Sequence, residues 1–145
     1  MNSNAFWVSP SVNVMIGHPN VGKTTTIKHL IKNGFIAEKL HYVIVFCNRP
    51  MKEKYSSWIP EEFIYTSFSE EVIYKILLKQ ESYKNRGYEV QAVIIFDDIG
   101  GYKEKFYDNC KLMVKLHTEH RHFNLTVFIG VQTATMISSK DIKGS

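Results

Sequence analysis

Residues 17–24 read Gly-His-Pro-Asn-Val-Gly-Lys-Thr and match the pattern G-x-x-x-x-G-K-[ST] at every fixed position. The match lies between two segments of different periodicity. Val12–Ile16 is a short apolar run that predicts a buried strand. Residues 23–33 carry apolar side chains at helical spacing and are followed by Gly34, where a helix stop is expected. The chain is therefore constrained here to a strand, a tight glycine loop and a helix.

Two further helices are expected downstream. Ser67 and Glu70 have the three-residue spacing of a capping box and predict the start of a helix that ends before Gly87. A second helix is expected over residues 103–121. The apolar faces expected for these helices are Val72, Ile73, Ile76 and Leu77 in the first, and Phe106, Cys110, Met113, Val114 and His117 in the second.

The remaining apolar runs predict strands, with a polar loop over residues 51–62. Strands that are apolar on both faces and alternate with helices are typical of a parallel sheet covered on both sides. We therefore predict an α/β fold, a three-layer sandwich with a mainly parallel sheet, formed by one domain over residues 1–145. The predicted strands, besides Val12–Ile16, are Tyr42–Cys47 and residues 63–66, 90–96 and 125–129.

Composition narrows the class of protein. A hydrophobic fraction of 44% with 22% charged residues allows a real core, so disorder is not expected. The net charge of +4 favours an anionic partner only weakly, and a lysine-rich solvated surface explains it equally well. Cys47 and Cys110 form no C-x-x-C pair, which indicates a reducing compartment. No apolar run approaches the roughly 20 residues needed to span a bilayer, and no signal peptide is visible.

The glycine loop predicts a phosphate-binding P-loop (Walker A motif). Its glycines let the backbone fold round an anion with the N–H groups pointing inward, and the helix N-terminus adds a favourable field. In such loops the lysine reaches the β- and γ-phosphates, and the following hydroxyl ligates magnesium. A chance match is the alternative, but the strand and helix on either side favour the P-loop. The candidate ATP-binding residues are Gly17, His18, Pro19, Asn20, Val21, Gly22, Lys23, Thr24 and Thr25, with Thr24 also a Mg²⁺ ligand.

Two adjacent acids follow the apolar strand at residues 90–96 and complete a Walker B pattern. A carboxylate at the carboxyl end of a buried parallel strand points into the crevice where ligands bind. We expect Asp97 to hold Mg²⁺ and Asp98 to orient and polarise the attacking water. The alternative is that the two acids merely end a strand and begin a turn.

The order of these motifs limits the kind of P-loop protein. A strand at Tyr42–Cys47 falls between the P-loop and the acidic strand, and paired acids suit an enzyme that supplies its own base. Both features resemble the ATPase branch with an additional strand and a catalytic acid. The absence of an N-K-x-D motif anywhere in the sequence disfavours a GTPase. A small-molecule kinase stays open, although no arginine-rich lid is visible.

An arginine and a glutamine flank the last predicted strand. Arg121 precedes it, and Gln132 follows its carboxyl end. With this placement the sequence resembles the FtsK–HerA superfamily of DNA-pumping ATPases, and most closely the genome-packaging ATPases of large DNA viruses and virophages. The resemblance implies that Gln132 senses the γ-phosphate and that Arg121 is an arginine finger reaching the neighbouring subunit. Taken alone, Arg121 reads as a helix-dipole partner and Gln132 as a surface residue.

The resemblance also implies the wider function. It predicts a homo-oligomeric, ring-forming, Mg²⁺-dependent ATPase that translocates double-stranded DNA into a virion, with capsid or portal-vertex proteins as further partners. The expected location is the host cytoplasm or the virion, or the cytoplasm if the protein is not viral. Two departures stand out: Asp98 replaces the glutamate of many relatives, and the chain ends soon after Gln132, which suggests C-terminal truncation. The alternative is a non-motor P-loop protein, either a nucleotide-dependent switch or a small-molecule kinase.

Overall fold

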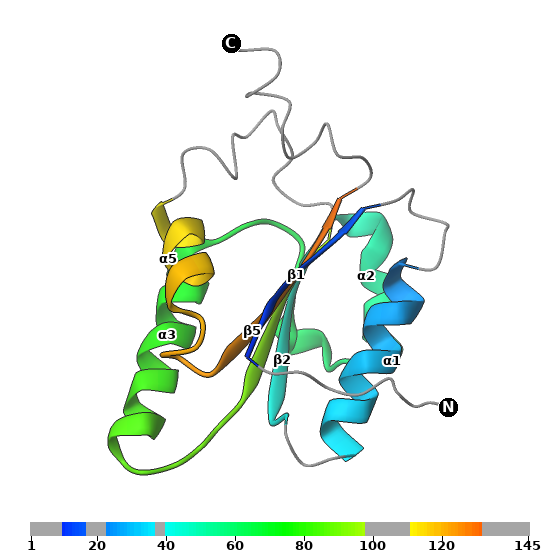
Figure 1. Cartoon of the computed structure of the whole chain (residues 1–145). Helices are drawn as coiled ribbons and strands as arrows, with labels where there is room; N and C mark the ends of the chain where they lie inside the picture. Colours follow the sequence, from blue (N-terminus) through cyan, green and yellow to red (C-terminus); the bar gives the residue numbers. More distant parts are fainter. Residues whose placement is uncertain (1–9, 17–22, 37–39, 98–110, 132–145) are drawn as a thin grey trace.

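The computed structural model describes residues 10–16, 23–36, 40–97 and 111–131, which form one five-stranded sheet with helices on both faces (Figure 1). All strand pairs are parallel, so the predicted α/β fold with a mainly parallel sheet is confirmed. No helix in the described part of the chain is long and apolar enough to cross a membrane. The elements are β1 (Val12–Ile16), α1 (Lys23–Ile36), β2 (Tyr42–Cys47), α2 (Arg49–Ser56), the 3-10 helix η1 (Glu61–Phe63), β3 (Ile64–Tyr65), α3 (Glu70–Asn85), β4 (Ala92–Asp97), α5 (Lys111–Glu119) and β5 (Leu125–Val131).

The strand order is β1-β5-β4-β2-β3. The last strand of the described chain, β5, therefore lies between β1, which precedes the glycine loop, and β4, which ends in Asp97. β2 (Tyr42–Cys47), which falls between β1 and β4 in the sequence, lies on the other side of β4 in the sheet, so the strand between β1 and β4 in space is β5. Both neighbours of β5 run parallel to it, so all three strands end at the same edge of the sheet.

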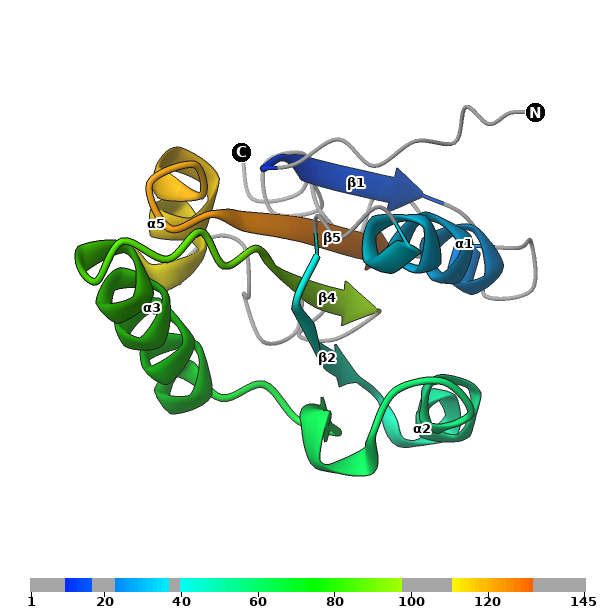
Figure 2. The same ribbon diagram turned by 90° about the horizontal axis from the view of Figure 1, so that it is seen from below.

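Helices α1 and α2 cover one face of the sheet, and α3 and α5 cover the other (Figures 1 and 2). The alternation of side chains along each strand gives both faces an apolar surface. In β4, Val93 and Ile95 pack in the core under α1 and α2, whereas Ile94 and Phe96 pack in the core under α3 and α5. The central strands are therefore buried on both sides, as the continuous apolar runs predicted.

A buried glutamine ties α3 to the sheet. Gln80 is 2% exposed, and its Nε2 donates to the carbonyl oxygens of Val90 (2.7 Å) and Phe123 (2.9 Å). Its Oε1 accepts a hydrogen bond from the hydroxyl of Tyr42 at 2.7 Å. One amide thus fixes the segments that lead into β2, β4 and β5.

Several local predictions are corrected. Residues 51–62 were expected to form a polar loop, but α2 begins at Arg49 with Pro50 in its first turn. The helix stop expected at Gly34 is also wrong, because α1 continues past it. Gly34 is buried on the same face as Ile27 and Ile31. Packing of this face against the sheet outweighs the roughly 1 kcal/mol that glycine costs in a helix.

The helices on the other face differ in two details. The N-cap of α3 is Ser69, whose hydroxyl accepts from Val72 N at 3.3 Å, and not Ser67. In α5, Met113 is buried as expected, but Val114 is 58% exposed and His117 is also exposed. Leu112 and Leu116 are buried in their place, because the apolar face of α5 is rotated by about one position. Phe106 and Cys110 lie outside the described residues.

Candidate functional site

The carboxyl ends of β1, β5 and β4 meet at one edge of the sheet. Asp97, the last residue of β4, lies in register with Gly130 of β5, and Gly130 lies in register with Met15 of β1. One step further along, Ile16 pairs with Val131. The three strand ends therefore coincide to within one residue. This edge is where parallel α/β sheets bind ligands.

Each of these strand ends leads directly into a predicted site residue. Gly17 follows Ile16, Asp98 follows Asp97, and Gln132 follows Val131 in the sequence. Asp98, Gln132 and the whole glycine loop over residues 17–22 lie outside the described residues. The described strand ends that precede these three segments in the sequence lie at this edge.

Helix α1 begins at Lys23, and its first turn lies at this same edge (Figure 1). Lys23 and Thr24 are the first two helical residues, although their side chains lie outside the described part of the structure. Thr25 is exposed. The helix packs on the sheet through Ile27 and Ile31, both fully buried. This packing holds the amino end of α1 beside the end of β1. Unpaired N–H groups and the helix dipole stabilise an anion bound at such a helix end.

Asp97 is the best-defined of the predicted site residues. It is 0% exposed, and the alternation along β4 places its side chain on the face covered by α1 and α2. The hydroxyl of Tyr55, in α2, donates to Asp97 Oδ2 at 2.6 Å, which is typical of a hydrogen bond from O–H to a carboxylate. A carboxylate in this position suits Mg²⁺, which prefers oxygen ligands, often one or two carboxylates together with phosphates and water.

Cys47 neighbours this carboxylate at the end of β2, where it lies in register with Asp97. Burial, with a smaller contribution from the nearby charge of Asp97 and a partly opposing one from Lys52, raises the pKa of the Cys47 thiol to about 11. The thiol is therefore neutral at physiological pH and unsuited to act as a nucleophile.

Arg121 lies near the amino end of β5, at the opposite end of the strands from Asp97. It follows α5 in the turn that leads to β5, its side chain is exposed, and its carbonyl accepts from Asn124 N at 3.3 Å. Five residue steps along β5 separate Leu125 from Gly130, the residue in register with Asp97, which corresponds to about 16 Å of strand. The strands thus bring Asp97, but not Arg121, to the end of the sheet at which α1 begins.

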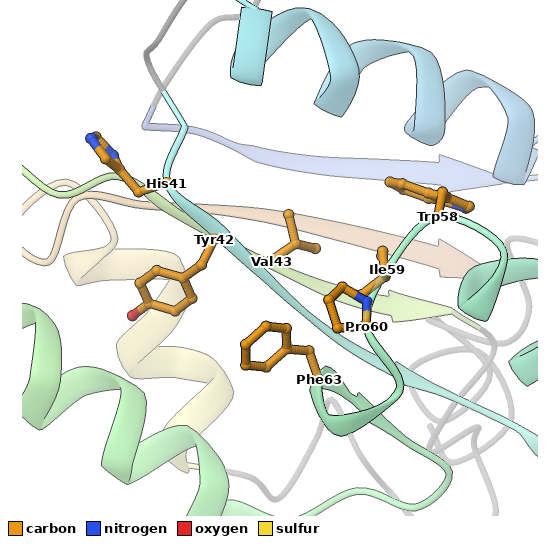
Figure 3. Close-up of a pocket in the computed structure, with 7 residues that line it drawn as sticks. All are labelled: His41, Tyr42, Val43, Trp58, Ile59, Pro60 and Phe63. Atoms are coloured by element: carbon orange, nitrogen blue, oxygen red, sulfur yellow. The ribbon is translucent and has the colours of Figure 1, made fainter.

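A separate pocket of about 220 Å³ lies at the amino end of β2 (Figure 3). Tyr42, Trp58 and Phe63 contribute aromatic side chains to it, and Pro60 closes one side. Tyr42 pairs with Ala92, the first residue of β4, so this part of the lining is at the far end of the strands from Asp97. Trp58, also in the lining, packs on Tyr55, the residue that contacts Asp97.

Comparison with known proteins decides the family. The family described as "Poxvirus A32 protein" matches residues 3–142, nearly the whole chain. The chain belongs to the poxvirus A32 protein family. No curated protein matches it.

Two solved structures share the fold of this A32 family member. The genome packaging NTPase B204 from Sulfolobus turreted icosahedral virus 2, solved in complex with ATP-γS, matches 85% of this chain and 66% of its own, with a TM-score of 0.53 and 17% identity. C. elegans PCH-2 matches 91% of this chain but 31% of its own, with a TM-score of 0.51 and 12% identity. The A32 chain therefore spans less than two thirds of either protein, and at these identities the likeness concerns the fold.

Together, the family and the structural neighbour from a virus confirm the resemblance to viral genome-packaging ATPases.

One residue beside the site escaped the sequence analysis. Tyr55 contacts Asp97, but it falls in the segment expected to be a loop. The signal available was the i, i+4 spacing of Met51 and Tyr55, both buried on one face of α2.

Proposed function

We propose that this A32 family member is a Mg²⁺-dependent ATPase that translocates double-stranded DNA during the packaging of a viral genome. The observation that carries the proposal is the convergence of β1, β4 and β5 at the edge where α1 begins. In the sequence, the predicted P-loop, the second of the paired acids and the glutamine follow these strands directly, which supports the proposal. The family and the fold of the B204 NTPase support the same assignment.

The nucleotide-binding part of the site consists of the loop and the start of α1. Backbone N–H groups of residues 17–22 surround the phosphates, and Lys23 contacts the β- and γ-phosphates. The hydroxyl of Thr24 is a ligand of Mg²⁺, and Thr25 lies next to it at the helix start. In this role the amino end of α1 stabilises the negative charge of the nucleotide.

The hydrolytic part comes from the strands. Asp97 would hold Mg²⁺, which when bound would neutralise the charge that develops on the phosphate oxygens. Asp98 orients and polarises the attacking water. Gln132, which follows β5, senses the γ-phosphate. Since Arg121 lies at the other edge of its own sheet, it serves as the arginine finger of a neighbouring subunit's site.

These roles define the assembly and its partners. An arginine that acts across a subunit boundary requires a homo-oligomer, for which a ring round double-stranded DNA is the arrangement expected. Capsid or portal-vertex proteins are the other partners proposed, in the host cytoplasm or the virion. The net charge of +4 agrees with a polyanionic substrate.

The test is steady-state ATP hydrolysis with and without duplex DNA, over a range of protein concentrations. We expect turnover to rise on adding duplex DNA and to depend steeply on protein concentration, since the complete site forms only in the oligomer. Lys23→Ala serves as the inactive control. Hydrolysis that is indifferent to duplex DNA and proportional to protein concentration would instead favour a nucleotide-dependent switch or a small-molecule kinase.

A further inference from the structure

Helix α2 holds a rigid position over the carboxyl ends of β2 and β4. It starts directly after Cys47, with Asn48 in extended conformation as the N-cap and Pro50 in the first turn. Proline is favoured there because its fixed φ suits a helix start and its missing N–H needs no partner. Met51 and Tyr55, one helical turn apart, are 6% and 0% exposed. The short helix is thus fixed to the sheet by its buried face.

Tyr55 is fixed through both its ring and its backbone. The ring packs on Trp58 with the ring centroids 5.9 Å apart and the planes tilted by 40°. Its carbonyl accepts from Trp58 N at 3.1 Å and from Ile59 N at 2.8 Å, so the backbone round it is fixed as well. A phenol that is fully buried and packed in this way has little freedom to turn its hydroxyl elsewhere.

The partner of that hydroxyl is the Asp97 carboxylate, 42 residues away in the sequence. The bond is buried, and Oδ2 is its acceptor at 2.6 Å. In a low-dielectric environment a charge-assisted hydrogen bond of this length is strong, and it restricts rotation of the carboxylate about its χ2 angle. Tyr55 therefore sets the direction in which Asp97 presents its oxygen atoms to the edge where α1 begins.

We propose that Tyr55 is a positioning residue that orients Asp97 for Mg²⁺-nucleotide binding. This inference rests on the proposed function, in which Asp97 is a Mg²⁺ ligand. Residues that hydrogen-bond a ligating carboxylate commonly change metal affinity by about 10- to 100-fold when they are removed. Tyr55 acts through Asp97 and does not itself contact the nucleotide.

The test measures the affinity for ATPγS by calorimetry, once with excess Mg²⁺ and once with EDTA. The quantity of interest is the Mg²⁺-dependent gain in affinity. Tyr55→Phe should reduce this gain about tenfold and leave the affinity in EDTA unchanged, because only the orientation of the metal ligand is lost. A purely structural role would shift both affinities together.

Tyr42→Phe is the matched control. It removes another tyrosine hydroxyl from a 2.7 Å hydrogen bond, but the acceptor is Gln80 on the other face of the sheet. We expect it to destabilise the fold and to leave the Mg²⁺-dependent gain as in the wild type. Binding is measured at a temperature at which circular dichroism shows every variant to be folded.

A double-mutant cycle identifies the route of the effect. Added to Asp97→Asn, which should itself remove most of the gain, Tyr55→Phe should cause no further loss. An unchanged gain in Tyr55→Phe alone, or an equal additional loss in the Asp97→Asn background, would overturn the positioning role while leaving the proposed function intact. A wild-type protein that binds ATPγS equally well with and without Mg²⁺ would overturn the proposed function and this inference with it.

Discussion

Arg121 and Asp97 lie near opposite ends of two neighbouring parallel strands. Asp97 ends β4, whereas Arg121 precedes β5, and β4 and β5 run parallel with Ala92 beside Leu125. The separation of about 16 Å along the strand exceeds the reach of an arginine side chain, which is about 7 Å. If Arg121 contributes to hydrolysis, it does so in a site other than that of its own chain.

The first prediction concerns Lys23. Lys23→Ala should abolish ATP hydrolysis and weaken nucleotide binding, because the ammonium group that contacts the β- and γ-phosphates is lost. The fold should persist, since Ile27 and Ile31 still pack α1 on the sheet. Lys32→Ala, an exposed lysine of the same helix, is the control and should hydrolyse ATP normally. A Lys23→Ala protein with near wild-type turnover would contradict the P-loop assignment.

The second prediction separates the two acids. Asp98→Asn should still bind Mg²⁺-ATP but lose turnover, since an amide cannot polarise water as a carboxylate does. Asp97→Asn should instead weaken the Mg²⁺ dependence of binding. Magnesium titrations of binding and of hydrolysis distinguish these outcomes. Small and equal effects from both substitutions would mean that the acids only end the strand and begin a turn.

The third prediction concerns stability and the buried amide of Gln80. Gln80→Leu leaves the Tyr42 hydroxyl and two carbonyl groups without this partner, so we expect a loss of about 2–4 kcal/mol in the free energy of unfolding. Urea denaturation followed by circular dichroism measures it. Lys75→Ala, which breaks an exposed ion pair with Glu71, should cost less than about 0.5 kcal/mol and is the control. A similar cost for both substitutions would contradict the role given to Gln80.

Much of the fold could be predicted because the central strands carry a strong signal. Tyr42–Cys47 was predicted with the observed bounds, since a buried parallel strand is apolar on both faces. Val12–Ile16, which lies at the edge of the sheet beside β5, was also predicted with its observed bounds. Helix α2 was missed because only Met51 and Tyr55 mark its buried face within a segment rich in lysine, glutamate and serine. A helix this short has no extended periodicity, and its position over β2 depends on packing.

The candidate site was predictable to the extent that it is local in sequence. The glycine loop and the acids follow predicted strands directly in the sequence, so the motifs and strand direction are enough to predict that they lie together. The contact between Tyr55 and Asp97 joins residues 42 positions apart and depends on where α2 lies, which no motif records. The cap of α3 illustrates the same limit: Ser67 has the motif spacing, yet Ser69 makes the hydrogen bond.

The shared site gives the most direct test of an oligomeric packaging ATPase. Arg121→Ala should bind ATP almost normally and hydrolyse it very slowly, because an arginine finger stabilises the transition state and is worth on the order of 10³ or more in rate. Lys23→Ala should be inactive for the opposite reason, since it lacks the phosphate contact but keeps the finger.

The decisive measurement is ATP hydrolysis by a mixture of these two variants in the presence of duplex DNA. Size-exclusion chromatography of differently tagged chains verifies that joint oligomers form. Such oligomers contain interfaces at which a site with an intact Lys23 meets a partner's intact Arg121. The account predicts that the mixture recovers activity that neither variant has alone. No recovery in verified joint oligomers would contradict it, and would mean that Arg121 only stabilises the end of its own helix.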